Sequence, residues 1–287
     1  MFVDPFETAC TLLPDKLASG LAELRRTEEL RLRVGQRPTA LIAGREIPFS
    51  EKKLTGEEIG RVVEIATGAS LHSAAASLKN GFLPYRGLRI GICGEAAVAD
   101  GSLLGFQTIR SLAVRIPQPC PSACAEAALK CMEDGAQSTL IIAPPGVGKT
   151  SLLRCLIRCA SKRGLRVGVI DERCELSGCH GGECACDLGP CSDVMIGLDK
   201  HTAAMLLLRA MNPEILAMDE ITHSRDLETV KNAAGCGVLL FATAHARSLE
   251  DMRTRPLYRE LLDQGIFTRL VYISLCEGRR QYAHIPL

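Results

Sequence analysis

The stretch that decides the fold covers residues 143–154 and reads APPGVGKTSLLR. It matches the phosphate-binding loop pattern G-x-x-x-x-G-K-[ST], except that Ala143 stands at the first glycine position. The preceding residues 138–142, STLII, are typical of a buried strand, and Leu152 and Leu153 begin the apolar face of a helix. Because such a loop must follow a strand and open a helix, the sequence predicts a working nucleotide site rather than a turn that binds nothing.

The residue types in this loop suit a polyphosphate. Glycines let backbone N–H groups approach the β-phosphate, and the helix N-terminus adds a partial positive charge. We expect Lys149 to reach the β- and γ-oxygens and the Thr150 hydroxyl to ligate Mg²⁺. A small residue suffices at Ala143 if its φ stays negative, since Pro144 and Pro145 preset the turn. The predicted nucleotide-binding residues are Pro145, Gly146, Val147, Gly148, Lys149, Thr150 and Ser151.

A second apolar strand ends in two carboxylates. Residues 214–220 read EILAMDE, and they follow the loop by about seventy residues. In P-loop enzymes an acid at this place holds the Mg²⁺ shell, here Asp219 through water, and we expect Glu220 to polarise the attacking water. The alternative is a strand that is merely capped by surface acids.

Two further strands are expected to end at the same edge of the sheet. Residues 167–173 read VGVIDER and residues 239–245 read LLFATAH. Ligands of open parallel sheets bind at the carboxyl ends of the strands, so we expect Glu172, Thr243 and His245 to line the γ-phosphate side. Thr243 or His245 could sense phosphate by hydrogen bonding, although His245 could instead be an ordinary exposed loop histidine.

The chain is predicted to have two domains. Residues 1–117 mix short strands with helices, as in a smaller α+β domain, and IPQPCPS at 116–122 reads as a linker. Residues 118–287 alternate strands with helices, which predicts an α/β fold with a parallel sheet covered on both faces. In the first half we expect strands at 29–34, 39–42, 88–93 and 108–116, a helix at 55–66, and turns at Gly94, Asp100, Gly101 and Gly105. In the second half we expect strands at 138–142, 166–170, 215–218 and 237–242, helices at 123–133, 149–163, 200–211 and 224–234, and a long loop before residue 200.

Composition favours a cytoplasmic protein without a nucleic-acid partner. Lys and Arg number 34 against 33 Asp and Glu, and Trp is absent, so neither a global basic field nor a rich stacking surface is present. The N-terminus lacks the positive start of a signal peptide, and no apolar run approaches the ~20 residues that cross a bilayer. We therefore expect contact with a membrane only through partner proteins.

The 14 cysteines are expected to be reduced, and most to act as small buried apolar residues. Residues 174–191 hold five cysteines and one histidine, which could bind Zn²⁺. The spacing C-x4-C-x-C-x4-C lacks the usual paired C-x2-C knuckles, so a flexible reduced loop is the favoured interpretation.

Several motifs together resemble the stage III sporulation protein AA family of spore-forming bacteria: APPGVGKTSLLR, VGVIDERCEL, LLLRAMNPEILAMDEI and LFATAHA, with GLRIGICGEAAVADG and IRSLAVRIPQ in the first half. More distantly, the chain is similar to the type II/IV secretion and pilus ATPases, which carry an arginine ahead of the second acidic strand, as Arg209 stands here. The resemblance implies a RecA-like P-loop NTPase core and a hexameric ring. It also implies work in the mother-cell cytoplasm, peripherally at a membrane channel built by other proteins of the same sporulation operon.

The resulting hypothesis is an ATP- and Mg²⁺-dependent P-loop ATPase, a motor that energises a secretion- or channel-like membrane complex during endospore formation. The predicted catalytic residues are Glu220, Glu172, Arg209 and His245. An arginine acting on a neighbouring subunit could be Arg173, Arg209, Arg110 or Arg115. Two alternatives stay open: a RecA-like ATPase that acts on nucleic acid, and a nucleotide-binding scaffold without turnover.

Overall fold

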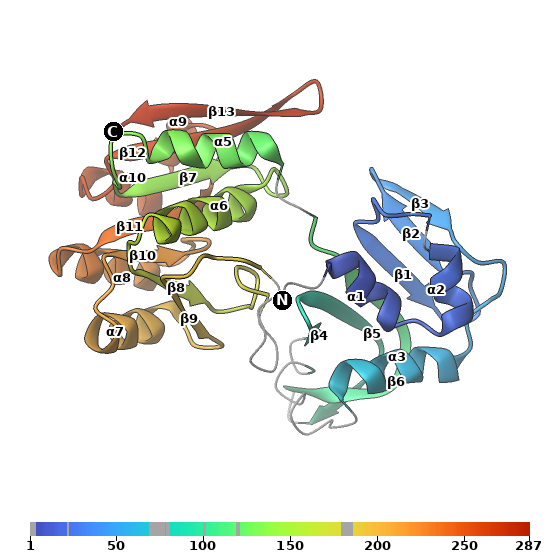
Figure 1. The fold of residues 1–287 in the computed structure, drawn as a ribbon. Coiled ribbons are helices and arrows are strands. Elements are labelled where there is room, and N and C mark those ends of the chain that lie inside the picture. Colours follow the sequence, from blue (N-terminus) through green and yellow to red (C-terminus); the bar gives the residue numbers. More distant parts are fainter. Residues whose placement is uncertain are drawn as a thin grey trace. The chain divides into compact units, whose positions relative to one another are not determined.

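A computed structural model describes residues 4–21, 23–68, 78, 81–99, 102–118, 121–178 and 186–287 of the chain. These residues form two compact units, which are coloured from blue to green and from green to red in Figure 1. Of the described residues, the first unit comprises those up to 118 together with 178 and 186, and the second comprises residues 121–177 and 187–287. No helix among these residues is both long and apolar enough to cross a membrane.

The first unit is a six-stranded antiparallel sheet in the order β3-β2-β1-β6-β5-β4, with helices on one face. The alternation of β1 places Leu30 and Leu32 in the core beside Ile59 of the third helix. The elements are α1 (Pro5–Thr11), α2 (Asp15–Leu21), β1 (Glu29–Arg33), β2 (Thr39–Ile42), β3 (Arg45–Pro48), α3 (Gly56–Thr67), β4 (Phe82–Tyr85), β5 (Leu88–Ala99) and β6 (Ser102–Arg115).

Helix α3 begins where its sequence predicts. The Thr55 hydroxyl accepts from the Glu58 N–H at 3.2 Å, and the Glu58 carboxylate accepts from the Thr55 N–H at 2.9 Å, which completes the capping box. Gly68 ends the helix in the left-handed conformation at φ 59°.

The prediction of turns at Gly94 and Gly105 is wrong, because Gly94 lies inside the long strand β5 and Gly105 inside β6. Gly94 sits at a register shift, and a Cβ there would come within 2.0 Å of the Thr108 carbonyl oxygen. The glycine therefore serves the close approach of two strands at a bulge and not a turn. Asp100 and Gly101 lie outside the described residues.

The second unit is a seven-stranded sheet in the order β13-β12-β7-β11-β10-β8-β9, in which only the β12–β13 pair is antiparallel. Its strands are β7 (Thr139–Ala143), β8 (Val167–Asp171), β9 (Ser192–Ile196), β10 (Ile215–Met218), β11 (Leu239–His245), β12 (Arg269–Cys276) and β13 (Arg279–Pro286). Its helices are α5 (Ser122–Cys131), α6 (Lys149–Lys162), α7 (Lys200–Ala210), α8 (Ser224–Gly235), α9 (Leu249–Thr254) and α10 (Pro256–Asp263).

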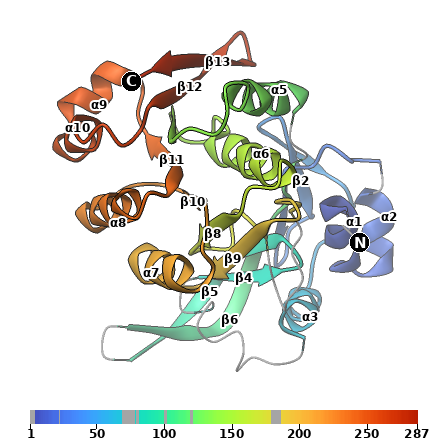
Figure 2. The same cartoon turned by 60° about the vertical axis from the view of Figure 1, so that its left-hand side comes forward.

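Helices cover both faces of this sheet, as predicted for an α/β fold. Alternate residues of β7 point to opposite sides: Ile141 packs with α5 and α6, whereas Leu140 and Ile142 pack with α7, α8, α9 and α10. Figure 2 shows α5 and α6 on one side of the strands and α7, α8 and α10 on the other. With both faces covered, the polar groups of this sheet concentrate at the strand ends.

The expected strand 215–218 is confirmed as β10. Strand β9 lies in the stretch that was expected to be a loop. The hairpin β12–β13 and the helices α9 and α10 add to the elements predicted from the sequence.

Candidate nucleotide-binding site

The loop between β7 and α6 has the backbone of a phosphate-binding loop. Gly146 adopts φ 75° and Gly148 adopts φ 115°, and Gly148 is the N-cap of α6. Side chains disfavour these left-handed angles, so the two glycines are required for the loop to curl. Ala143 is fully buried at the end of β7 and is not among the residues with positive φ, so alanine is tolerated at the first pattern position.

Lys149, the first residue of α6, folds back over this loop. Its Nζ lies 3.2 Å from the Ala143 carbonyl oxygen, 3.3 Å from that of Pro144 and 2.9 Å from Nδ1 of His245. Only 5% of the residue is exposed, and this burial lowers the pKa of the ammonium group, opposed by the nearby carboxylates of Asp219 and Glu220. A buried cation is thus held at the loop by neutral acceptors.

Asp219 directly follows β10 and is held on both carboxylate oxygens. The Thr150 hydroxyl donates to Oδ2 at 2.7 Å, and the Thr243 hydroxyl donates to Oδ1 at 2.5 Å. A hydroxyl and a carboxylate side by side are the hard oxygen donors that Mg²⁺ prefers, so Thr150 and Asp219 fit the predicted metal shell.

Glu220 is placed by an unusual backbone conformation. Its φ is 51°, and its N–H donates to the Thr243 hydroxyl at 2.9 Å. A left-handed φ is uncommon for a residue with a side chain, and it turns the strand end sharply here. The Glu220 carboxylate then reaches Nε2 of His245 at 2.8 Å, and Nη1 of Arg173 lies 3.7 Å from its other oxygen.

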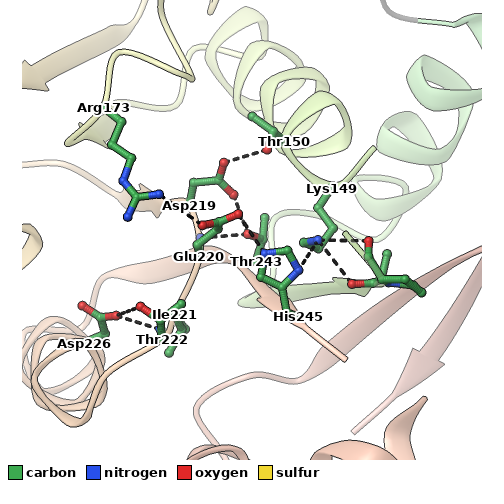
Figure 3. Close-up of polar contacts among 12 residues, drawn as sticks. Lys149, Thr150, Arg173, Asp219, Glu220, Ile221, Thr222, Asp226, Thr243 and His245 are labelled. Carbon is green, nitrogen blue, oxygen red and sulfur yellow. Dashed lines mark hydrogen bonds and ion pairs between the residues drawn. The ribbon is translucent and has the colours of Figure 1, made fainter. Parts of the chain in front are cut away.

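Figure 3 shows Lys149, His245 and Glu220 as one row, with Thr150 and Asp219 beside it. The ammonium group of Lys149 can only donate, so Nδ1 of His245 must accept. The imidazole proton then lies on Nε2 and is donated to Glu220. Histidine therefore links the cation of the loop to the carboxylate expected to act on water.

A pocket at the same edge of the sheet adjoins Glu220 and Asp219. Glu172 and Arg173, which follow β8, line it together with Lys200 at the start of α7. Asp171, the last residue of β8, is hydrogen-bonded within the chain: its carboxylate accepts from the N–H groups of Leu176 and Ser177 and from the Ser177 hydroxyl at 2.6 to 3.0 Å. The remaining lining residues are Ile170, Asp171, Glu175, Asp219, Glu220 and Thr222.

Thr243 has a different role from the phosphate sensor that was considered. It is fully buried, and its hydroxyl already donates to Asp219 and accepts from the Glu220 N–H. Thr243 therefore positions the acid pair.

Arg209 is not brought to this cluster within the chain. Lys200, the first residue of α7, donates to the Glu220 carbonyl oxygen at 2.5 Å. Arg209 follows nine residues later, about 13 Å further along the helix axis, and is exposed. Arg110 and Arg115 belong to the first unit, where the Nε of Arg115 lies 3.2 Å from a Glu29 oxygen.

Two basic residues at this edge were not predicted from the sequence. Lys200 also approaches Asp226 Oδ2 at 3.2 Å, and both side chains are about a tenth exposed. Arg280 on β13 donates from Nε to the Val147 carbonyl oxygen at 2.7 Å. A signal for the hairpin that carries Arg280 was available, since VYISLC, EG and RRQYAH read as two strands joined by a tight turn, but nothing in the sequence places this hairpin beside the loop.

Of the residues considered as an alternative zinc site in 174–191, Cys179, His180 and Cys184 lie outside the described residues. Within the described ranges, no group of three or more His, Cys, Asp or Glu side chains is placed to hold a metal ion.

The fold is shared with two solved structures. The ATPase DotB of Legionella pneumophila aligns with a TM-score of 0.61 at 15% identity, over 99% of this chain and 81% of that chain. The pilus retraction motor PilT, solved with bound ADP, aligns with a TM-score of 0.61 at 17% identity, over 91% of this chain and 80% of that chain. The protein is thus a RecA-like α/β P-loop protein with a separate antiparallel sheet, as the sequence predicts.

Within this class the chain belongs to the family described as sporulation stage III, protein AA, whose model matches residues 13–281. It is similar to the stage III sporulation protein AA of Bacillus subtilis (strain 168), with 30% identity over 279 residues, 93% of this chain and 90% of that protein. The resemblance seen in the sequence motifs is confirmed.

Proposed function

We propose that this protein is an ATP-hydrolysing motor of a membrane-associated complex formed during endospore formation. The observation that carries the proposal is the row Lys149–His245–Glu220 at the phosphate-binding loop, beside the Thr150–Asp219 pair. It places a cation, an oriented imidazole, a carboxylate and two hard oxygen donors at one strand edge, which is the equipment of phosphoryl transfer to water.

Nucleotide binding follows from the loop and from Lys149. The N–H groups of residues 146–150 surround the β-phosphate, and the N-terminus of α6 favours its charge. Phosphate oxygens replace the two carbonyl oxygens that Lys149 now contacts, which provides the buried ammonium group with an anionic partner. The gain is large because a neutral acceptor is exchanged for a charged one.

Hydrolysis is assigned to Glu220. Its carboxylate accepts a hydrogen bond from the attacking water and increases the electron density on the water oxygen. That oxygen forms a bond to the γ-phosphorus as the bond to the β,γ-bridging oxygen breaks. ADP leaves with the bridging oxygen, one water proton stays on the phosphate product and the other passes through the carboxylate to solvent. His245 holds that carboxylate in place from Nε2. Mg²⁺, held by Thr150 and Asp219 together with phosphate oxygens, would supply positive charge at the β- and γ-oxygens.

We propose further that the chain works as a homo-hexameric ring with residues 1–117 and 118–287 as its two domains. In this view it lies at the membrane in the mother-cell cytoplasm, bound to membrane proteins of the same sporulation channel. Family membership supports this placement. Arg173 already lies near Glu220 of its own chain, so a second cation for the transition state would come from Arg209, Arg110 or Arg115 of a neighbour.

The experiment that tests this function is phosphate release by the purified chain alone, with single-stranded DNA, and with membrane proteins encoded by the same sporulation operon. A motor of the membrane complex is expected to be stimulated by the membrane proteins and unchanged by DNA. Stimulation by DNA alone, lost as salt is raised, would replace the proposal by an enzyme acting on nucleic acid. ATP binding without phosphate release under any of these conditions would support the alternative of a nucleotide-binding scaffold without turnover.

A further inference from the structure

The hairpin formed by β12 and β13 ends beside the phosphate-binding loop. Strand β12 pairs with β7 in parallel, so both strands reach the same edge of the sheet at their carboxyl ends. The loop follows β7 at that edge, and the turn Glu277–Gly278 follows β12 there (Figure 1). The first residues of β13 therefore lie on the side of the loop that faces away from β11, which we call its outer side.

Arg280 makes the contact. Its Nε donates to the Val147 carbonyl oxygen at 2.7 Å. Its side chain also lies directly against the next residue, because a Cβ placed on Gly148 would be 3.0 Å from Nε and 3.5 Å from Cζ of Arg280. No carboxylate of the described residues forms an ion pair with this guanidinium group.

The peptide that Arg280 contacts is one that matters for phosphate binding. In a trans peptide the carbonyl oxygen and the following N–H point in opposite directions. A donor on the outer side of Val147 therefore fixes the N–H of Gly148 toward the inner side, where the phosphate binds. Because Gly148 is a glycine at φ 115°, the peptide could otherwise rotate with little steric resistance.

We propose that Arg280 is a positioning residue for the phosphate-binding loop: it holds the Val147–Gly148 peptide so that the Gly148 N–H faces the β-phosphate of the bound nucleotide. The inference rests on the proposed function, since it assumes that the loop binds a nucleoside di- or triphosphate. The bond is charge-assisted and comes from the same chain, so it is available before any assembly.

This role has a specific kinetic signature. ADP and ATP share the β-phosphate, so loss of the contact weakens both nucleotides alike. Glu220 and His245 do not contact Arg280, so turnover at saturating ATP is retained. A residue of the hydrolytic step would instead lower kcat.

The test compares Arg280→Ala and Arg280→Lys with the control Arg279→Ala. Arg279 is the preceding residue of β13, also exposed and basic, and its side chain points to the other face of the strand. Measured quantities are the dissociation constants of Mg·ADP and Mg·ATP, KM and kcat, and the melting temperature without nucleotide. Lysine keeps the positive charge but has no Nε–H to donate to the Val147 carbonyl oxygen. The Arg280→Lys variant therefore shows whether the loop needs this hydrogen bond or only a positive charge.

We expect both Arg280 variants to bind ADP and ATP about tenfold more weakly, with KM raised equally and kcat within about twofold of the wild type. Arg279→Ala should behave as the wild type, and all melting temperatures without nucleotide should agree. If Arg280→Ala binds nucleotide with wild-type affinity, or if Arg279→Ala loses as much affinity as Arg280→Ala, the positioning role of Arg280 is wrong, but the proposed function is not affected. A wild-type chain that binds no nucleotide would instead remove the proposed function.

Discussion

Lys149 and His245 are joined across the phosphate-binding loop, with Nζ 2.9 Å from Nδ1. The contact links the loop of β7 to the end of β11, the strand that neighbours it in the sheet. Since the other imidazole nitrogen holds Glu220, a change at the lysine is transmitted through one ring to the carboxylate expected to act on water. A phosphate that draws Lys149 away from His245 would leave the ring bound to Glu220 alone.

Replacement of Lys149 by alanine is expected to abolish nucleotide binding. The loop loses its own side-chain cation for the β- and γ-oxygens, while the backbone N–H groups stay in place. Binding of a fluorescent ATP analogue measures this directly. Lys162→Ala, at the exposed end of the same helix, is the matched control and should bind as the wild type. Unchanged affinity for the ATP analogue in Lys149→Ala would contradict the proposal that this loop binds the phosphates of the nucleotide.

Nucleotide binding at alkaline pH should be accompanied by proton uptake. Burial lowers the pKa of Lys149 below 10.5 in the free protein, and a bound polyphosphate favours the charged ammonium form again. Between the lowered pKa and 10.5 the complex therefore holds more protons than the free chain, and affinity falls as pH rises. Titration calorimetry at several alkaline pH values up to 10.5, in two buffers of different ionisation enthalpy, measures the uptake, since phosphate esters are fully ionised there. Heats that do not depend on the buffer would contradict it.

The cysteines should separate into two reactivity groups. Cys93, Cys236 and Cys276 are exposed, whereas Cys131 is 1% exposed and burial raises its pKa to about 11. Iodoacetamide at about pH 8 should modify the exposed thiols first, as read by mass spectrometry, because the thiolate is the nucleophile. Equal rates would mean that Cys131 is not packed as described. The same raised pKa also makes the free energy of unfolding depend on pH. Between the unfolded value of 9.0 and about 11, the Cys131 thiol stays protonated in the folded chain but ionises in the unfolded chain. Its contribution to the free energy of unfolding is therefore complete below pH 9.0 and is lost as the pH rises to about 11.

If the chain works as the proposed ring, the activity of each chain should depend on its neighbours. If an arginine of one chain completes the site of another, activity per chain falls on dilution below the assembly constant. Mixing wild-type chains with Glu220→Gln chains should then lower activity by more than the mutant fraction. A constant activity per chain on dilution, with strictly proportional loss on mixing, would show that each chain works alone.

The central strands and their acids could be predicted from the sequence because their signals are local. Strand β10 is buried throughout, and Asp219 and Glu220 follow it directly in the chain. Strand β9 was missed because it is a short, half-buried edge strand whose apolar run covers only residues 194–196. Arg280 could not be assigned to the loop, since 133 residues separate it from Val147 and only the pairing of β12 with β7 brings them together.

The most direct test of the central claim is the number of phosphates released per chain from Mg·ATP, with wild type and Glu220→Gln measured side by side. The wild type is expected to release many phosphates per chain. Glu220→Gln should bind Mg·ATP with wild-type affinity, because the amide keeps the shape, yet turn over about a hundredfold or more slowly. Glu228→Gln, which changes an exposed acid of α8 outside this site, is the control and should remain active. Fewer than one phosphate per wild-type chain even with the membrane partners, or equal rates for wild type and Glu220→Gln, would contradict the account.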